Sequence, residues 1–281
     1  LSTETYLNFD KLAYAIKASG ADAVHPGYGF LSENADFAAM VMQAGCVFIG
    51  PTPESMGLLG NKIAARRLME DNGIPMVPGL KEAITEVATL EKFVDEHGFP
   101  IILKAAAGGG GRGMRVVRDK AGLADALTAC RREAQDYFGN PDVFCERYLE
   151  NPRHIEFQIL FDSHGDGVHL FERDCSVQRR HQKLLEEAPS AFLDEAARER
   201  IGAIAVQAGK LSNYCGAGTV EFICDSPEKA YFMEVNTRIQ VEHPVTELIT
   251  GVDLIKAQMR VTSGQPLGWQ QQDIKLQGWA A

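Results

Sequence analysis

The sequence lacks any run of about 18 apolar residues that could cross a membrane, and no signal peptide is visible at its start. Its six cysteines show no C-x-x-C spacing and lie mostly in apolar contexts. This usage is typical of reduced core thiols in a cytoplasmic protein, or one of the mitochondrial matrix in a eukaryote.

Positive charge is also scarce. The chain has 28 lysines and arginines against 38 acidic residues, for a net charge of −10. No basic stretch is interleaved with aromatic residues, so nucleic acid is not expected as the main partner. Internal repeats and low-complexity tracts are absent as well, and 45% apolar with 23% charged residues suits a protein of two domains or lobes.

No Walker motif G-x-x-x-x-G-K-[ST] occurs. Residues 108–113 fit G-x-G-x-x-G, but the strand-like Met114 to Val117 follows where that fingerprint requires a helix. Phe99 to Lys104, the glycine run and the returning strand therefore predict a flap whose backbone N–H groups close over phosphates, with Lys104 and Arg112 adding charge. The alternative is a hairpin tip that binds nothing.

The first 60 residues alternate between helix and strand patterns, which predicts part of a parallel α/β sheet. The expected elements are a helix over Asn8 to Ser19, a strand over Ala21 to His25, a helix over Ser32 to Ala44 and a strand over Cys46 to Ile49. Pro51 to Gly60 is expected to form a crossing, followed by a helix over Asn61 to Asn72. Because the chain starts at Leu1 without Met, we expect a piece of a longer protein.

Polar residues occupy every second position from residue 234 to residue 242. They are Glu234, Asn236, Arg238, Gln240 and Glu242. In an extended chain these side chains share one face. Acids, amides and a cation in a row can hold a metal, an anion and a proton acceptor together. The alternative is a solvated strand face.

The segment upstream, Thr219 to Glu234, has the pattern of a β-hairpin around a turn-rich centre. If Cys224 faces Tyr231, the register also pairs Ile223 with Phe232, Phe222 with Met233, and Glu221 with Glu234. Two facing carboxylates destabilise a strand pair unless a positive charge lies between them. A hard divalent cation would supply that charge, with Asn236 as a further oxygen ligand.

Four stretches of the chain together carry a resemblance to a known family. They are His25 to Asn34, Lys104 with the glycines at 108–113, Glu172 to Lys183, and Glu234 to Glu247. They resemble the biotin carboxylase component of biotin-dependent carboxylases, a member of the ATP-grasp superfamily, and the similarity extends over essentially the whole chain.

The resemblance implies a fold that is α/β, with α+β character in its ATP-grasp part. Residues 1–60 would be the C-terminal part of a Rossmann-like parallel N-terminal domain. Residues 61–269 would form the ATP-grasp domain, with a glycine-rich lid at about 77–148. Residues 270–281 would begin a truncated C-terminal domain.

The implied activity is that of a ligase that carboxylates biotin on a carrier protein, using ATP, Mg²⁺ (or Mn²⁺) and bicarbonate, through carboxyphosphate. Expected partners are a biotin carboxyl carrier and a carboxyltransferase, and the whole protein is expected to form a homodimer. Truncated at both ends, this chain is expected to turn over weakly or not at all. Two alternatives remain: another ATP-grasp ligase such as a carbamoyl-phosphate synthase, and a non-catalytic nucleotide-binding remnant.

The resemblance also implies roles for individual residues. The nucleotide would be held by Lys62, Lys104, Gly110, Gly111, Glu146, Arg147, Tyr148, Leu149, His154, Gln178 and His181. The metal ligands would be Glu221, Glu234 and Asn236. Bicarbonate would be bound by Lys183, Arg238, Gln240, Val241 and Glu242. Among these, Glu242 would take the bicarbonate proton, and Arg238 with Lys183 would steady the anion.

Overall fold

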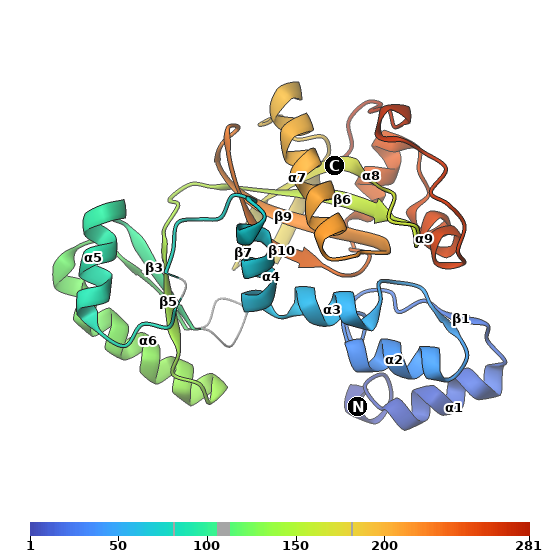
Figure 1. Ribbon diagram of the computed structural model, residues 1–281, viewed down its shortest axis with the longest axis horizontal. Coiled ribbons are helices and arrows are strands. Elements are labelled where there is room, and N and C mark those ends of the chain that lie inside the picture. The colour runs from blue at the N-terminus through green and yellow to red at the C-terminus, as the bar shows by residue number, and fades with distance from the viewer. Residues whose placement is uncertain (81, 106–112, 181) are drawn as a thin grey trace. The chain divides into compact units, whose positions relative to one another are not determined.

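The computed structural model describes residues 1–80, 82–105, 113–180 and 182–281. The chain divides into two compact units (Figure 1). The first unit contains residues 1–75, 153–177 and 184–281, and the second contains residues 76–152 and 178–183. Three predicted site residues, Gly110, Gly111 and His181, lie outside the described residues.

Both units contain helices and strands. The α-helices are α1 (Phe9–Ser19), α2 (Ala35–Gln43), α3 (Pro53–Gly60), α4 (Lys62–Asp71), α5 (Val87–His97), α6 (Leu123–Phe138), α7 (Glu195–Leu211), α8 (His243–Thr250) and α9 (Leu254–Thr262). The strands are β1 (Ala23–Val24), β2 (Val47–Phe48), β3 (Ile101–Ala105), β4 (Met114–Val117), β5 (Val143–Arg147), β6 (Arg153–Phe161), β7 (Gly167–Arg179), β8 (Gln182–Glu187), β9 (Gly216–Ser226) and β10 (Lys229–Asn236). Three short 3₁₀ helices are η1 (Ser2–Glu4), η2 (Lys120–Gly122) and η3 (Gln271–Asp273).

The N-terminal part of the first unit contains the predicted parallel strand pair, β1 beside β2. Asn8 and Asn34 cap α1 and α2 through their side-chain oxygens, so both helices begin one or more residues after the predicted start. The crossing expected over Pro51 to Gly60 is in part helical. Thr52 caps a helix there, α3, and Pro53 supplies its first turn.

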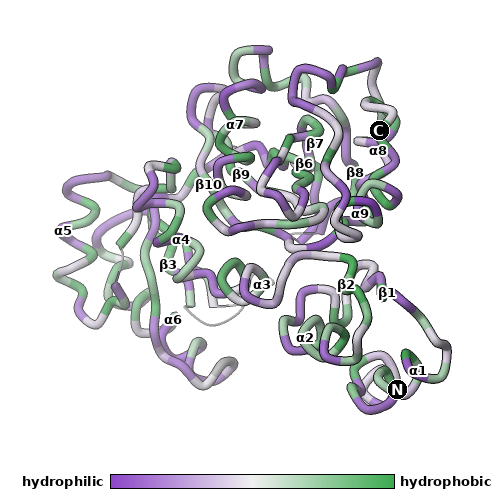
Figure 2. Tube along the Cα trace, turned by 45° about the vertical axis from the view of Figure 1, so that its right-hand side comes forward, coloured by the Kyte–Doolittle hydropathy of each residue, from purple (hydrophilic) through white to green (hydrophobic). Residues whose placement is uncertain are grey.

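A five-stranded sheet, in the order β10-β9-β6-β7-β8, forms the centre of the first unit. The pairs β10–β9, β9–β6 and β6–β7 are antiparallel. Phe161 of β6 packs under α7, whereas its neighbour Leu160 points to the other face and joins the core formed with Leu254 of α9. Helices therefore cover both faces of this sheet (Figure 1), and the hydrophobic stretches near β6 and β7 lie between them (Figure 2).

The second unit has a three-stranded antiparallel sheet, β4-β3-β5, whose core includes residues of α5 and α6. The predicted strands on either side of the glycine run are confirmed, with Lys104 opposite Met114. Cys130 and Cys145 lie in this core as free thiols. Burial raises the pKa of Cys130 to about 11 and that of Cys145 to about 12, so both stay protonated and unreactive.

Within the part of the chain that the structure describes, no helix combines the length and the apolar character needed to cross a membrane. The helices instead present one apolar face to a sheet or to a neighbouring helix.

We predict that Gly209→Ala destabilises the fold. A Cβ at Gly209 of α7 would lie 2.3 Å from a ring carbon of Phe161, which is buried and cannot move aside. The free energy of unfolding should fall by about 1–3 kcal/mol in urea denaturation. Gly57→Ala in α3 is the matched control, because its Cβ would meet nothing within 4 Å, and it should stabilise by about 0.5–1 kcal/mol. Equal effects of the two changes would contradict this packing argument.

Candidate active site

Glu221 lies directly opposite Glu234 in the β9–β10 hairpin, as predicted. The predicted register between this pair and the turn is wrong by one residue. The observed pairs are Ala230 with Cys224, Tyr231 with Ile223, and Phe232 with Phe222. Asp225 is skipped on β9 and Met233 is skipped on β10, so two bulges on opposite strands cancel. The carboxylates therefore face each other although the central pairs do not follow the regular register.

The predicted extended face does not continue to Glu242. Strand β10 ends at Asn236, and Glu242 occupies the position before α8. Residues 237–242, here called the site loop, connect the two elements. Thr237, Ile239 and Gln240 are buried, whereas the side chain of Val241 is 60% exposed. Glu242 therefore reaches the site from a turn and not from the strand face.

Arg173 of β7 is fully buried and ties the site loop to the sheet. Its five N–H groups all have partners, each itself buried. Nε donates to Glu156 (2.6 Å), Nη1 to Gln158 (2.9 Å) and Thr246 (2.9 Å), and Nη2 to Thr219 (3.1 Å) and Gln240 (2.6 Å). Because Gln240 belongs to the site loop and Thr246 to α8, one guanidinium fixes both to the sheet.

Sequence reasoning missed Arg173 and Glu156. The available signal was the position of an arginine within Val168 to Cys175, a stretch that the structure buries almost completely. A charge in such a stretch requires a buried partner. Glu156, on the neighbouring strand β6, provides it.

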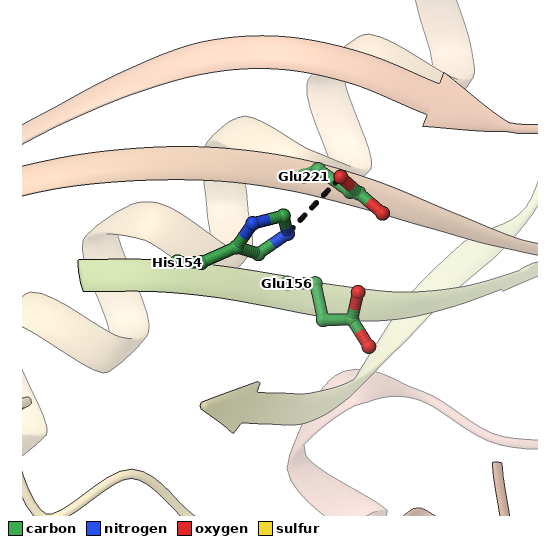
Figure 3. Close-up of side chains that lie close together, drawn as sticks. All are labelled: His154, Glu156 and Glu221. Atoms are coloured by element: carbon green, nitrogen blue, oxygen red, sulfur yellow. Dashed lines mark ion pairs between the residues drawn. The ribbon is translucent and has the colours of Figure 1, made fainter. Parts of the chain in front are cut away.

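Three polar side chains surround Glu221. Asn236 Nδ2 donates to it at 2.8 Å and Gln240 Nε2 at 3.3 Å, and His154 Nε2 lies 3.0 Å from its other oxygen. Figure 3 shows His154 and Glu156 on β6 beside Glu221 on β9. Ligand atoms of these three residues lie within 4.8 Å of one another, a spacing that suits a cation.

Glu156 belongs to two such groups, one with Glu221 and one with Glu242, the predicted base. Glu156, Cys175 and Glu242 form a second group whose ligand atoms lie within 4.8 Å of one another. Three carboxylates thus converge beside one buried guanidinium. Such a site is rich in oxygen acceptors and favours a cationic ligand.

Lys62 and Glu234 form an ion pair of 3.1 Å at the start of α4. Both residues border a hollow of about 380 Å³ in the first unit. Its other lining residues are Glu33, Leu59, Gly60, Ala65, Met233, Val235, Asn236 and Thr237. The hollow therefore brings together Lys62, a predicted nucleotide-binding residue, and the predicted metal ligands Glu234 and Asn236.

Arg238 contacts the same region through Glu33, a residue to which sequence reasoning gave no role. Arg238 Nε donates to Glu33 Oε2 at 2.9 Å, and the backbone N–H of Thr237 donates to Glu33 Oε1 at 3.0 Å. Arg238 Nη2 donates to Asn236 Oδ1 at 3.2 Å. Asn236, a predicted metal ligand, thus accepts a hydrogen bond from Arg238, a predicted bicarbonate-binding residue.

The remaining predicted residues lie in the second unit. Lys104 pairs with Glu146 across the adjacent strands β3 and β5. The backbone N–H groups of Arg147 and Tyr148 bond to Pro78 and Pro100, and Leu149 is buried. Gln178 at the end of β7 and Lys183 in β8 are both half-buried.

Comparisons with known proteins agree with this architecture. Residues 1–56 match the family described as biotin carboxylase, N-terminal domain, and residues 61–270 match the carbamoyl-phosphate synthase L chain, ATP binding domain. The chain belongs to the biotin carboxylase family. Biotin carboxylase 1 of Bacillus subtilis is 49% identical over 99% of this chain and 62% of the relative. The biotin carboxylase of Haemophilus influenzae is 50% identical with the same coverage of each.

Solved biotin carboxylases share the fold. A nucleotide complex of the Campylobacter jejuni biotin carboxylase superposes with a TM-score of 0.89 at 46% identity, over 98% of this chain and 61% of that one. The biotin carboxylase domain of a thermophilic 2-oxoglutarate carboxylase bound to bicarbonate gives a TM-score of 0.91 at 44% identity, over 98% and 60%. The chain thus spans about three-fifths of the length of the biotin carboxylases that it matches.

We predict that Arg173→Met destabilises the chain strongly, because it leaves Glu156 as a buried charge without its arginine. Loss of one partner of a buried pair costs roughly 3–5 kcal/mol, measurable by urea denaturation. Lys256→Met breaks an exposed pair with Asp253 instead and serves as the control, with an expected cost of about 1 kcal/mol or less. A similar small loss for Arg173→Met would show that the buried network contributes little.

Proposed function

We propose that this chain forms the catalytic part of a biotin carboxylase, which uses ATP and bicarbonate to carboxylate biotin on a carrier protein through carboxyphosphate. One observation carries the proposal. The facing pair Glu221 and Glu234, with Asn236 beside it, shares one region of the first unit with the cations Lys62 and Arg238. Acidic oxygens and cations side by side suit a metal-bound phosphate that reacts with an anion.

The residues present fit Mg²⁺ or Mn²⁺. Glu221, Glu234 and Asn236 offer oxygen atoms, which both ions prefer. In this structure the ammonium group of Lys62 lies 3.1 Å from Glu234, which supports the proposal that a positive charge binds here. Asn236 has to turn its amide to offer Oδ1, since that atom accepts from Arg238. When bound with ATP, the metal supplies neutralisation of charge on the phosphate oxygens.

The site loop would bind bicarbonate. Arg238 offers a planar guanidinium to a planar anion. Gln240 and the backbone of Val241 add further contacts, and Lys183 adds a second cation. Glu242 would accept the bicarbonate proton, so that the freed oxygen attacks the γ-phosphorus of ATP, the bond to the β–γ bridging oxygen breaks, and ADP leaves as carboxyphosphate forms. Crystal structures of 2-oxoglutarate carboxylase domains with bicarbonate support this assignment, since they share the fold at 44% and 46% identity.

The residues proposed to hold the nucleotide are Lys62, His154, Lys104, Glu146 to Leu149, Gln178, Gly110, Gly111 and His181. The pairing of Lys104 with Glu146 supports this assignment because it holds the lysine in place at the end of β3. A Hydrogenobacter thermophilus relative solved with magnesium ADP supports it further, at 46% identity and a TM-score of 0.87.

The carboxyl group would pass from biotin to an acceptor on a separate carboxyltransferase. Related chains include the propionyl-CoA carboxylase alpha chain of Ruegeria pomeroyi, at 47% identity, and the pyruvate carboxylase of Aspergillus niger, at 50%. We propose a biotin carrier and a carboxyltransferase as partners and a homodimer as the assembly.

ADP release from Mg-ATP and bicarbonate tests this function. It should be measured with and without free biotin on this chain and on a chimera extended at both ends with the flanking sequence of the Bacillus subtilis relative. We expect biotin to stimulate release by the chimera, and release by the chain itself to be weak. Turnover indifferent to biotin in both proteins would contradict the proposal and favour a different ATP-grasp ligase. A chimera with no turnover and no thermal stabilisation by Mg-ATP would instead indicate a non-catalytic remnant.

We predict that Glu242→Gln abolishes bicarbonate-dependent turnover, because the amide cannot accept the proton. Nucleotide affinity should stay within about twofold, since Glu242 lies beyond the hairpin. Glu221→Gln is the matched comparison and should instead weaken Mg-nucleotide binding by about tenfold or more. Titration calorimetry with Mg-ADP and the ADP-release assay separate the two effects. Undiminished turnover in Glu242→Gln would rule out this residue as the base.

A further inference from the structure

The stretch His25 to Asn34 is one of the four that mark the family resemblance, yet none of the catalytic roles above uses it. In the structure it leaves β1 through a tight loop in which Gly27, Gly29 and Phe30 have positive φ angles of 64°, 71° and 47°. Phe30 is a non-glycine residue in this strained region, which indicates that the surrounding contacts enforce the loop shape.

Hydrogen bonds fix the first half of this loop. His25 Nδ1 accepts from the backbone N–H of Gly27 at 3.0 Å, and His25 Nε2 lies 3.2 Å from Gln258 Oε1. Gln258 belongs to α9 and is buried. The start of the loop is therefore held against α9, a helix that packs on the five-stranded sheet of the first unit.

The second half is fixed by turns around Glu33. The N–H of Ser32 donates to Gly29 at 3.0 Å, and the N–H of Asn34 donates to Leu31 at 3.1 Å. Asn34 then caps α2. The backbone of Glu33 thus stands between a turn and a helix start, and its side chain leaves from a defined position.

Each oxygen of the Glu33 carboxylate accepts from one residue of the site loop. Oε1 accepts from the Thr237 N–H at 3.0 Å and Oε2 from Arg238 Nε at 2.9 Å. The contact joins residues 205 positions apart in the chain. A single carboxylate therefore holds the start of the site loop and the guanidinium of its arginine.

In the described part of the chain, Glu33 accepts a hydrogen bond from Nε of Arg238 but none from Nη1 or Nη2. Nη1 donates to the carbonyl of Ile239 and Nη2 to Asn236 Oδ1, each at 3.2 Å. Among the described residues, three of the five guanidinium N–H groups thus have hydrogen-bond acceptors. The remaining two, one on each Nη, can bind an oxyanion. Arginine side chains lose substantial rotamer freedom on binding, so an arginine already held in place binds an anion at lower entropic cost.

We propose that Glu33 is a positioning residue that orients Arg238 for the bicarbonate anion. The proposal rests on the role proposed above for Arg238. A carboxylate beside the guanidinium also repels a second anion, which opposes bicarbonate binding. Glu33 is 43% exposed, so water screens much of that repulsion. Orientation should therefore outweigh repulsion.

The test compares Glu33→Ala and Glu33→Gln with Asp36→Asn, each made in the chimera described above, in the ADP-release assay. Asp36 is an exposed carboxylate three residues away, in the first turn of α2, and Asp36→Asn removes the same charge without touching the site loop. We expect Glu33→Ala to raise the KM for bicarbonate roughly threefold to tenfold, the effect of freeing one side chain. Glu33→Gln keeps one acceptor oxygen and should give a smaller rise. The KM for ATP and the parameters of Asp36→Asn should stay unchanged.

A second measurement does not depend on activity. Heteronuclear NMR of the arginine Nε–H groups, with Arg238 assigned through Arg238→Lys, reports whether its Nε–H is protected from solvent exchange. We expect protection in the unmodified chain and in Asp36→Asn, and faster exchange in Glu33→Ala.

The outcomes separate this proposal from the proposed function. An unchanged or lowered KM for bicarbonate in Glu33→Ala would overturn the positioning role. If no protein responds to bicarbonate, the proposed function fails, and the NMR result decides whether Glu33 orients Arg238. Equal exchange in Glu33→Ala and the unmodified chain would overturn the proposal in that case too.

Discussion

The site depends on one buried guanidinium. Arg173 contacts two residues of β6, one of β9, one of the site loop and one of α8. Removing a charge from water is costly, and here the cost is offset only because every N–H of the arginine finds an acceptor. The same bonds determine where the loop runs after β10. Catalytic geometry and core stability therefore rest on the same group of contacts.

Much of the fold could be predicted from the sequence, because local patterns determine it. The helices α1 and α2, the strands β1 and β2 and the strands around the glycine run all follow from short-range signals, although the caps Asn8 and Asn34 were not predicted. The facing of Glu221 and Glu234 was also correct. The bulges at Asp225 and Met233 could not be predicted from the sequence, because neither position carries a glycine or another local signal for a bulge.

The chain after Asn236 shows a different limit. Alternating polar residues predicted a continuous strand face, but β10 ends at Asn236, and in the loop that follows Gln240 turns inward and accepts a hydrogen bond from Arg173. That partner lies 67 residues earlier in the chain. Likewise, nothing near Arg238 in the sequence points to Glu33, which contacts it from the N-terminal part of the unit. Long-range contacts of this kind come from the tertiary fold and leave no periodic trace.

The two units also differ in how they can be assembled during synthesis. The core of the second unit draws on residues 84–145, which leave the ribosome as one continuous stretch. The five-stranded sheet instead requires β6 to pair with residues of β9 that lie 55 to 71 positions later in the chain. Such pairings form slowly because a long loop must close first. The small unit can therefore fold while the large sheet still awaits its last strands. The carboxylates of the site come together only when β9 and β10 have joined.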